Sequence, residues 1–562
     1  MNIKNSIRLV IAEAAQINQE EISVEHPEVE EFGEYSTNIA LVLKGGKKLA
    51  EKIAAKIEKN GLIDSVNVDG PGFINIRMKN EFLVGILNEI ESLTNKFGSG
   101  EVLKGKKIMV EFAHPNTHKE LHIGHMRTLI TGEAVARILS FEGAEVFRAN
   151  YQGDIGPHVA KAIWGTEKIL CERGLGWEDA DKLNNAQKAH LLGEGYVRGN
   201  TDYDQNKSEI DTLNIKIYAH DQEVAPVYEL TRRWSLNYYD TFYNRFGTKF
   251  DKLYFESGMA NHGKKIVTEN VGRVFEVSDG AIIFDGAKYG LHKRVFVTTD
   301  GNPTYEGKEM ALAYAQIADF AFDKVVHVVA NEQKGYFDVV IKVLEILDKQ
   351  FEGREFHLSM GMVNLVGRKM SSRTGEILTV DGLLDEVRSL LPIKVDDEDI
   401  SEAVTIGAVK YSVLKPQPTM NVAFDIKQSV SLEGNSGPYL QYTFARTQSV
   451  LSKSQISNSK FQTGAKLQIQ NLSLNKEELA VLRWIYRFPE VVEDAAKRFS
   501  PNLVCSYLYE LAQRFNSFYN QHSILSADNS DLIVFRLKLT NAVGQVLKNG
   551  LELLGIAALE RM

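Results

Sequence analysis

Hydrophobic residues follow different spacings in three successive parts of the chain. Residues 1–95 combine helical spacing with short alternating runs, which indicates a small α+β domain. Residues 106–395 alternate short apolar runs with helical segments, which is typical of a doubly wound α/β domain built on a parallel sheet. Residues 396–562 return to helical spacing, which indicates an all-α bundle. We therefore predict three domains with these bounds.

The first domain should contain three helices and two strands. Helical spacing predicts helices over 7–15 and 47–59, and the stretch 32–41 runs from a loop into another helix. Short runs over 66–68 and 70–76 predict two strands around a tight turn. Lysines of the helix at 47–59 either face water or contact a nucleic acid.

The second domain should contain the parallel sheet. Apolar runs predict strands over 107–112 and 146–150, with a helix over 123–139 between them. The segment from about 160 to 250 is helical and irregular, which suits an insertion between the two halves of the sheet. Further strands and one helix follow it: strands 281–284, 295–299, 324–330 and 356–360, and helix 337–347.

The third domain is interrupted once. Residues 452–475 are rich in Ser, Gln, Asn and Lys, so we expect an exposed loop there. Helical spacing resumes from 476 to 562, as Leu511, Phe515 and Phe518 illustrate.

Composition narrows the class of protein. The 562 residues carry a net charge of −9, so any polyanion must be held by local basic patches. Cys171 and Cys505 are the only cysteines, which excludes a disulfide framework and a cysteine-based zinc site. The sequence has no apolar run of membrane-spanning length and no signal peptide. We expect a cytoplasmic protein without membrane association.

The first candidate for chemistry is the stretch from Ala113 to Thr128, which contains His122-Ile-Gly-His125. It joins the strand at 107–112 to a helix, and free N–H groups at a helix start favour an anion such as phosphate. Gly124 allows a ligand close to the backbone, and the two histidines, three residues apart, can face the same anion. Capping or surface histidines are an alternative. Metal ligands are another, although no third ligand stands at zincin spacing.

The second candidate is Arg368-Lys-Met-Ser-Ser-Arg-Thr-Gly-Glu376, a loop with cations, hydroxyls and a glycine after a predicted strand. Such a loop suits a polyphosphate, with Lys369 placed to neutralise charge while bonds to phosphorus change. The alternative is a basic surface loop without a ligand. The sequence has no Walker-type phosphate loop to compete for the nucleotide.

Together, these two motifs resemble those of the class I aminoacyl-tRNA synthetases. The first motif, read from Pro115-Asn116 to Thr128, is similar to the form of this motif in the arginyl-tRNA synthetases. Other stretches resemble the same family: Gly33–Ala40, Gly70–Asn75, Asn150–Gly156, Asp300–Tyr305, Gly434–Tyr442, Phe515–Tyr519 and Leu554–Met562. The resemblance covers almost the whole chain and is weakest around 165–225. It implies a Rossmann-like catalytic domain, an extra N-terminal domain and a C-terminal anticodon-binding bundle.

The resemblance implies that the chain is an arginine–tRNA ligase, which makes arginyl-adenylate from L-arginine and ATP and then transfers arginine to the 3′ end of tRNA(Arg). Catalysis would rest on His122, His125 and Lys369. The implied ATP-binding set is His122, Gly124, His125, Lys369, Met370, Ser371 and Arg373. The implied arginine-binding set is Asn116, Glu256, Tyr305, Glu309 and Gln333. Carboxylates suit a planar guanidinium, which they can hold through two hydrogen bonds.

Three positions depart from the family pattern. Ser372 stands where many class I enzymes have a second lysine, which leaves more of the charge to Lys369 and Arg373. Glu309 replaces an aspartate that is one methylene shorter, and in Ala330–Gln333 only Gln333 matches. Without the resemblance, Glu256 and Glu309 would be read as surface carboxylates.

For tRNA, the resemblance implies contacts from both outer domains. Aromatic side chains can stack on bases that leave a loop. The implied set is Asn38 and Phe73 in the N-terminal domain, with Tyr442, Tyr519 and Met562 in the bundle. Core packing is the alternative for Phe73 and for Tyr442.

We expect a monomer that uses Mg²⁺ together with ATP, contains no structural metal, and requires bound tRNA before it activates arginine. Three alternatives remain open: a synthetase for another amino acid such as lysine, a tRNA-binding paralogue without catalysis, and a general nucleotidyltransferase.

Overall fold

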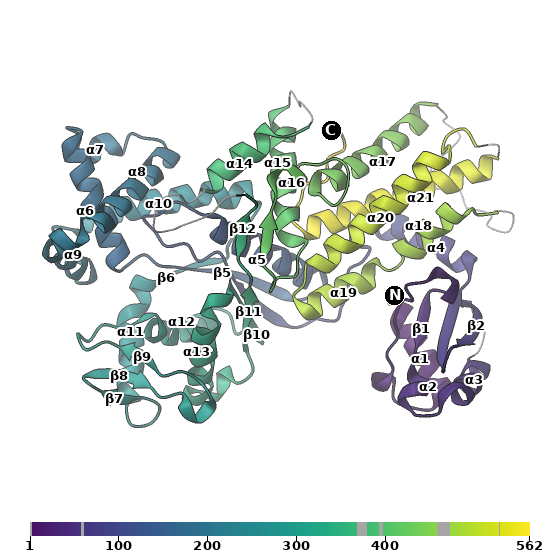
Figure 1. Cartoon of the computed structure of the whole chain (residues 1–562), viewed down its shortest axis with the longest axis horizontal. Coiled ribbons are helices and arrows are strands. Elements are labelled where there is room, and N and C mark those ends of the chain that lie inside the picture. The colour runs from purple at the N-terminus through teal and green to yellow at the C-terminus, as the bar shows by residue number, and fades with distance from the viewer. Residues whose placement is uncertain (1–2, 58–60, 368–378, 393–396, 458–472, 528) are drawn as a thin grey trace.

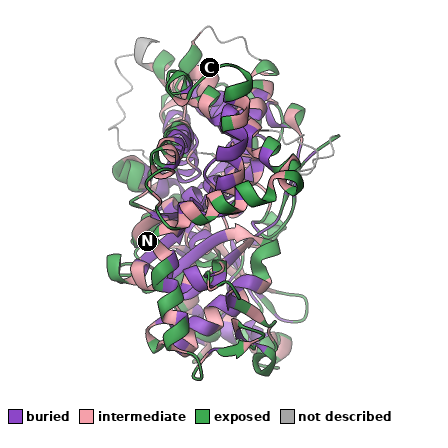
Figure 2. Cartoon of the chain, turned by 90° about the vertical axis from the view of Figure 1, so that its left-hand side faces the viewer, coloured by how far each residue is buried: buried purple, intermediate pink, exposed green. Residues whose placement is uncertain are grey.

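The computed structural model describes the chain except residues 1–2, 58–60, 368–378, 393–396, 458–472 and 528. Figure 1 shows a central sheet with a helical insertion on one side and a helix bundle on the other, and the N-terminal domain lies below the bundle. One cluster of buried apolar residues extends from Ile7 through Ile130 to Leu547, so the domains share a core. Figure 2 shows that buried residues line the strands and the inner helix faces.

The N-terminal domain packs helices on a three-stranded antiparallel sheet. The sheet has the order β1 (Tyr35–Thr37), β3 (Phe73–Met78), β2 (Ile63–Asp69). Its helices are α1 (Ile3–Ala15), α2 (Ile39–Val42), α3 (Gly46–Lys56) and α4 (Asn80–Leu93). The sequence interpretation missed β1, because a three-residue strand is too short to show an alternating pattern.

The central sheet is parallel and five-stranded. Its order is β11 (Glu355–Met360), β10 (Lys324–Ala330), β4 (Lys107–Glu111), β5 (Glu145–Gln152), β6 (Lys252–Phe255). Helix α5 (Ile123–Phe141) follows β4, and α13 (Lys334–Leu347) follows β10. This order confirms the predicted doubly wound domain. Strand order reverses between β4 and β10, and in such sheets ligands bind beyond the carboxyl ends of the strands at that point.

The helical insertion interrupts the sheet at a different point than the sequence suggested. Its helices are α6 (Pro157–Glu172), α7 (Trp177–Ala180), α8 (Asn185–Thr201), α9 (Tyr203–Tyr218) and α10 (Ala225–Arg245). They stand between β5 and β6, which pair with each other, so the insertion interrupts the first half of the sheet. The prediction that it separates the two halves was wrong, because the four-residue strand β6 gave no clear pattern.

A smaller unit separates the halves. It consists of α11 (Glu256–Glu269), α12 (Tyr305–Asp319) and an antiparallel sheet of β7 (Glu276–Ser278), β8 (Ala281–Phe284) and β9 (Arg294–Val297). Two of the strands predicted from apolar runs therefore belong to this sheet and not to the parallel one.

The rest of the chain is mainly helical. Strands β12 (Val363–Leu365) and β13 (Val422–Phe424) pair with each other. The helices are α14 (Val380–Ser389), α15 (Glu398–Leu414), α16 (Ile426–Ser429), α17 (Gly437–Ser457), α18 (Lys476–Ile485), α19 (Phe488–Arg498), α20 (Asn502–Gln521) and α21 (Ser530–Leu553). Because α17 extends to Ser457, residues 452–457 of the expected loop at 452–475 are helical, and 458–472 lie outside the described residues. Among the described helices, none is long and apolar enough to cross a membrane.

Candidate functional site

The two motif histidines form the start of α5. His122 is the N-cap residue, and its Nδ1 accepts from the backbone N–H of Gly124 at 3.0 Å. The backbone N–H of His122 donates to Nδ1 of His125 at 3.4 Å, and the two rings stack with centroids 3.8 Å apart. Both Nδ1 atoms are therefore acceptors, so each neutral ring carries its proton on Nε2. The Nε2–H groups remain as donors for a ligand.

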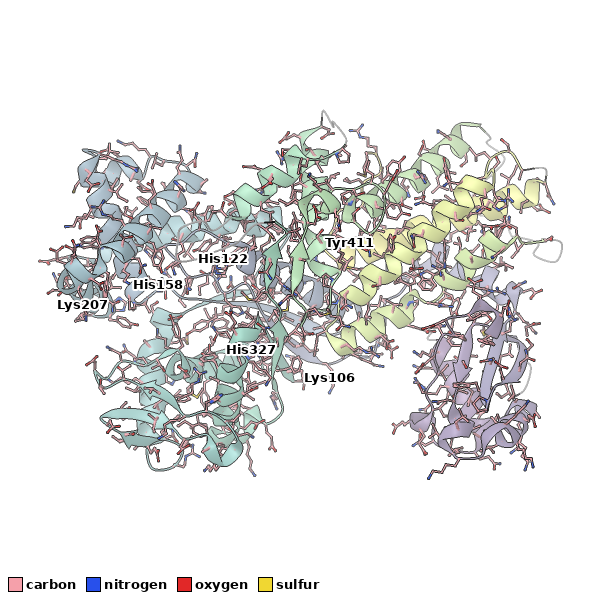
Figure 3. All side chains as sticks on the ribbon, in the orientation of Figure 1. Lys106, His122, His158, Lys207, His327 and Tyr411 are labelled. Atoms are coloured by element: carbon pink, nitrogen blue, oxygen red, sulfur yellow. The ribbon has the colours of Figure 1, made fainter. Side chains whose placement is uncertain are left out.

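Burial keeps both rings uncharged near pH 7. It lowers the pKa of His122 to about 4, with a further contribution from Lys119, and it lowers the pKa of His125 well below the usual value. The pair thus offers neutral hydrogen-bond donors beside the positive end of the helix. In Figure 3, His122 lies between His158, on the side of the helical insertion, and Tyr411, on the side of the helix bundle. Within the described ranges, no group of three His, Cys, Asp or Glu side chains could hold a metal.

The second motif lies outside the described residues. This applies to Lys369, Met370, Ser371, Ser372 and Arg373. The residue that follows this segment, Thr379, forms a β-bridge with His122, and the N–H of Val380 donates to the carbonyl of Leu121 at 3.0 Å. The described chain therefore resumes directly beside the first motif.

All five residues of the implied arginine set line one cavity of about 370 Å³. Asn116 comes from the loop after β4, Glu256 from the start of α11, Tyr305 and Glu309 from α12, and Gln333 from the turn after β10. The cavity also contains side chains that the sequence interpretation did not select: Glu111, His114, Tyr151, Arg294, Glu306, Tyr336 and Phe337. It lies at the reversal point between β4 and β10, where a ligand is expected.

Two of the four cavity carboxylates are paired with a lysine or an arginine. Glu256 Oε2 lies 2.6 Å from Nζ of the buried Lys308. Glu306 Oε1 lies 3.1 Å from a guanidinium nitrogen of Arg294. These two carboxylates already have counter-charges.

Glu111 is part of a histidine network. His327 Nδ1 lies 3.2 Å from Glu111, while its Nε2 lies 2.6 Å from Glu355. Burial favours the neutral form of Glu111, but His327 and His114 outweigh burial and lower its pKa to about 2. Burial likewise opposes the charge on His327, and Glu111 and Glu355 outweigh it and raise its pKa well above the usual range. Glu111 is therefore a fixed negative charge in the cavity.

Glu309 differs from the other three carboxylates. The hydroxyl of Tyr336 donates to its Oε1 at 3.0 Å, and no described cation lies within ion-pair distance of it. Burial, with repulsion from Glu111, raises the pKa of Glu309 to about 8. A cation in this cavity would find Glu309 without a counter-charge, next to the charged Glu111.

Sequence reasoning missed Glu111, Lys308 and Tyr336. The sequence could have indicated Glu111, because it is the one acidic residue in the apolar stretch that predicts the strand at 107–112. Nothing in the sequence indicated that Lys308 pairs with Glu256, since the two stand on different helices and meet only in the folded chain.

The residues implied for tRNA are at the surface in both outer domains. Tyr442 and Tyr519 are 36% and 37% exposed, and the guanidinium of Arg446 lies 4.9 Å from the centre of each ring. Phe73 is 42% exposed and Asn38 is exposed, while Met562 is half-buried. The alternative of core packing for Phe73 and Tyr442 is therefore wrong.

Known families match the chain in three successive segments. Residues 1–78 match the arginyl-tRNA synthetase N-terminal domain, 89–426 the catalytic domain of the class I tRNA synthetases (R), and 440–562 the DALR anticodon binding domain. The chain is 30% identical over 572 residues to the arginine–tRNA ligase of Treponema denticola, covering 97% of this chain and 96% of that one. It is 30% identical over 558 residues to that of Bacteroides thetaiotaomicron, covering 92% and 91%.

Solved structures agree with these matches in fold. The arginyl-tRNA synthetase of Thermus thermophilus superposes with a TM-score of 0.83 at 23% identity, over 100% of both chains. That of Plasmodium falciparum gives 0.78 at 19% identity, over 100% of this chain and 99% of that one. Because its catalytic family covers more than half of the sequence and its relatives match nearly end to end, the chain belongs to the arginyl-tRNA synthetases.

Proposed function

We propose that this arginine–tRNA ligase binds arginine in the cavity between β4 and β10 and binds ATP at the start of α5. The observation that carries the proposal is the convergence of Asn116, Glu256, Tyr305, Glu309 and Gln333 on one cavity that contains an uncompensated carboxyl group. A general nucleotidyltransferase has no need of an acidic cavity of this kind or of an anticodon-binding domain.

The guanidinium of arginine would lie against Glu309 and Glu111. A guanidinium is always charged and matches carboxylate oxygens with paired hydrogen bonds. Glu111 supplies a fixed negative charge, and Glu309 ionises when the ligand's charge arrives. A neutral amino acid would leave Glu309 without a counter-charge, and sites that hold a substrate through such polar pairing discriminate by roughly 10⁴-fold. Asn116, Glu256 and Gln333 would hold the α-amino and α-carboxylate groups, while Tyr305 covers the opening.

ATP phosphates would accept hydrogen bonds from Nε2–H of His122 and of His125, with Gly124 allowing close approach. The arginine carboxylate then attacks the α-phosphorus. A new carboxylate–phosphorus bond forms, the bond to the leaving oxygen breaks, and pyrophosphate departs with its electron pair. Lys369 would stabilise the charge that develops in this step, with Met370, Ser371 and Arg373 against the nucleotide. The β-bridge between Thr379 and His122 supports the juxtaposition of the two motifs.

Magnesium would enter with ATP. Phosphate oxygens would hold the ion, which would neutralise part of their charge. The proposed roles of His122, His125 and Lys369 do not depend on this ion.

The three domains would divide the work as the sequence suggested. Residues 106–395, with the insertion at about 160–250, would carry catalysis. Residues 396–562 would read the anticodon through Tyr442, Tyr519 and Met562, and residues 1–95 would contact the tRNA body through Asn38 and Phe73. The exposed tyrosines around Arg446 support base stacking. We further propose a cytoplasmic monomer whose activation of arginine requires bound tRNA.

Exchange of labelled pyrophosphate into ATP tests the activation step. We expect exchange with arginine and not with lysine, and we expect it only when tRNA(Arg) is present. Glu309→Gln should reduce exchange with arginine at least a hundredfold, since a neutral amide lacks the charge that a guanidinium requires. Equal exchange with lysine, or full activity of E309Q, would overturn the assignment of this cavity.

A further inference from the structure

The loop that joins the arginine cavity to the motif histidines has an unfavourable backbone conformation. Ala113, His114 and His118 have φ angles of 80°, 51° and 63°, in the left-handed region that residues other than glycine avoid. Three such residues within six positions persist only when the surrounding structure holds them. The loop therefore needs a support that its own sequence does not supply.

Helix α10 of the insertion provides contacts to this loop. Thr231, Ser235 and Tyr239 stand four residues apart, so they share one helix face, and all three are buried. The N–H of His118 donates to Oγ of Ser235 at 2.9 Å, and Nε2 of His118 lies 2.8 Å from Oγ1 of Thr231. Figure 1 shows α10 reaching from the insertion toward the central sheet.

The side chain of His118 is a structural anchor in this contact. Burial lowers its pKa to about 3, so the ring is neutral. The hydroxyl of Thr231 donates to the carbonyl of Val227 at 2.8 Å and therefore accepts from Nε2–H of His118. The opposite nitrogen, Nδ1, then accepts from the hydroxyl of Thr117, which is 2.9 Å away.

Tyr239 makes the contact closest to the reacting groups. Its hydroxyl lies 2.6 Å from the carbonyl oxygen of Asn116 and 2.8 Å from that of Lys119, and its single hydrogen is shared between them. The side chain of Asn116 lines the arginine cavity, and the ammonium group of Lys119 is close enough to lower the pKa of both His122 and His125. One hydroxyl therefore joins the residue on the arginine side to the residue on the ATP side.

We propose that Tyr239 is a positioning residue for amino-acid activation: its hydroxyl holds the carbonyls of Asn116 and Lys119 against α10 and so sets the separation of the two substrate sites. Tyr239 does not line the cavity and is not expected to touch either substrate. The inference rests on the proposed function of the cavity and of the two histidines. It assigns to the helical insertion a role in the geometry of the first reaction step.

The test is Tyr239→Phe, which removes only the hydroxyl. Tyr507→Phe is a matched control, because the buried hydroxyl of Tyr507 also lies between two backbone carbonyls, those of Trp484 and Ile485, in the distant bundle. We expect both variants to lose similar thermal stability. In pyrophosphate exchange, Y239F should lose about tenfold to a hundredfold in kcat, because small misplacements of substrates cost that much. Y507F should retain the wild-type rate.

A second measurement separates positioning from a general loss of structure. If Tyr239 acts by placing the side chain of Asn116 in the arginine cavity, Y239F should have less than its full effect in an Asn116→Ala enzyme, whereas independent effects would multiply. Ser235→Ala is a smaller change on the same face of α10. If Y239F folds poorly, S235A replaces it as the test variant, and its kcat should be lower than that of the wild type.

Three results would overturn the inference while leaving the proposed function intact: Y239F as active as Y507F, full additivity with N116A, or, where Y239F folds poorly, unchanged kcat in S235A. Failure of the wild-type enzyme to exchange with arginine in the presence of tRNA(Arg) would instead refute the proposed function itself.

Discussion

The raised pKa of Glu309 predicts that arginine binding depends steeply on pH. Burial first, and then the negative charge of Glu111, raise this pKa to about 8. Below that pH the free enzyme carries a protonated carboxyl at this position, which cannot pair with a guanidinium. Arginine must then expel the proton in order to bind. The groups that face Glu309 are Glu111, Glu256, His327 and the hydroxyl of Tyr336.

The size of the effect follows from the protonated fraction. If only the ionised form binds, the apparent Kd is multiplied by about 1 + 10^(8 − pH), which is about 1.1 at pH 9, about 11 at pH 7 and about 100 at pH 6. Affinity should therefore fall close to tenfold per pH unit below pH 7 and level off above pH 9. At pH 7 the binding of each arginine should release about 0.9 proton.

Calorimetric titration with arginine in two buffers of different ionisation enthalpy measures both the affinity and the proton release. Glu309→Gln is the control, since its amide does not titrate and the ligand's own ionisation is unchanged. Its binding should be weak and should release no proton at this position. An affinity that stays flat between pH 6 and 9 in the wild type, or an equal slope in E309Q, would refute the reasoning.

The same pKa shift has a consequence for folding stability. Because the pKa of Glu309 is raised from its ordinary value of about 4.5, the folded state favours the protonated carboxyl. Its contribution to stability is complete below about pH 4.5 and is lost as the pH rises through 8. Bound arginine offsets this loss, so the increase in Tm on adding arginine should be larger at pH 8.5 than at pH 6.5.

Three further variants test other parts of the account. His125→Ala removes a donor to the ATP phosphates and should slow pyrophosphate exchange about 10²- to 10³-fold at saturating arginine, whereas an unchanged rate would remove His125 from the site. Lys308→Met leaves the buried Glu256 without its partner and should cost about 3–5 kcal/mol in urea unfolding at pH 7, part of which Glu256→Gln should restore. Arg127 donates to three backbone carbonyls beside the β12–β13 pair, so Arg127→Met should cost about 3 kcal/mol or more in the same assay.

Much of the fold could be predicted from local patterns. The helix start at His122 was visible because the glycine, the two histidines and the following apolar spacing all lie within a few residues of each other. Strands β4, β5 and β10 were visible as apolar runs, since parallel strands are buried on both faces. The short strands β1 and β6 were missed, and without β6 the insertion could not be placed between the correct strands.

The candidate site was predictable only where residues carry a motif. Asn116 and Tyr305 stand in recognisable stretches, whereas the charge state of the cavity depends on pairs formed by folding. The ion pair of Lys308 with Glu256 and the network of Glu111 with His327 join residues that are far apart in sequence. The contact of Tyr239 with the loop at Asn116–Lys119 could not be predicted from the sequence either. The segment that contains Tyr239 showed only the irregular helical spacing of the insertion.

The most direct test of the account is the charging of total tRNA with each labelled amino acid in turn, in the presence of ATP and Mg²⁺. We expect charging with arginine alone, strongly reduced by Lys369→Ala and by His125→Ala. Charging with another amino acid would contradict the assignment of the acidic cavity around Glu309. No charging with any amino acid, in a protein that still binds tRNA, would contradict the proposed catalytic site.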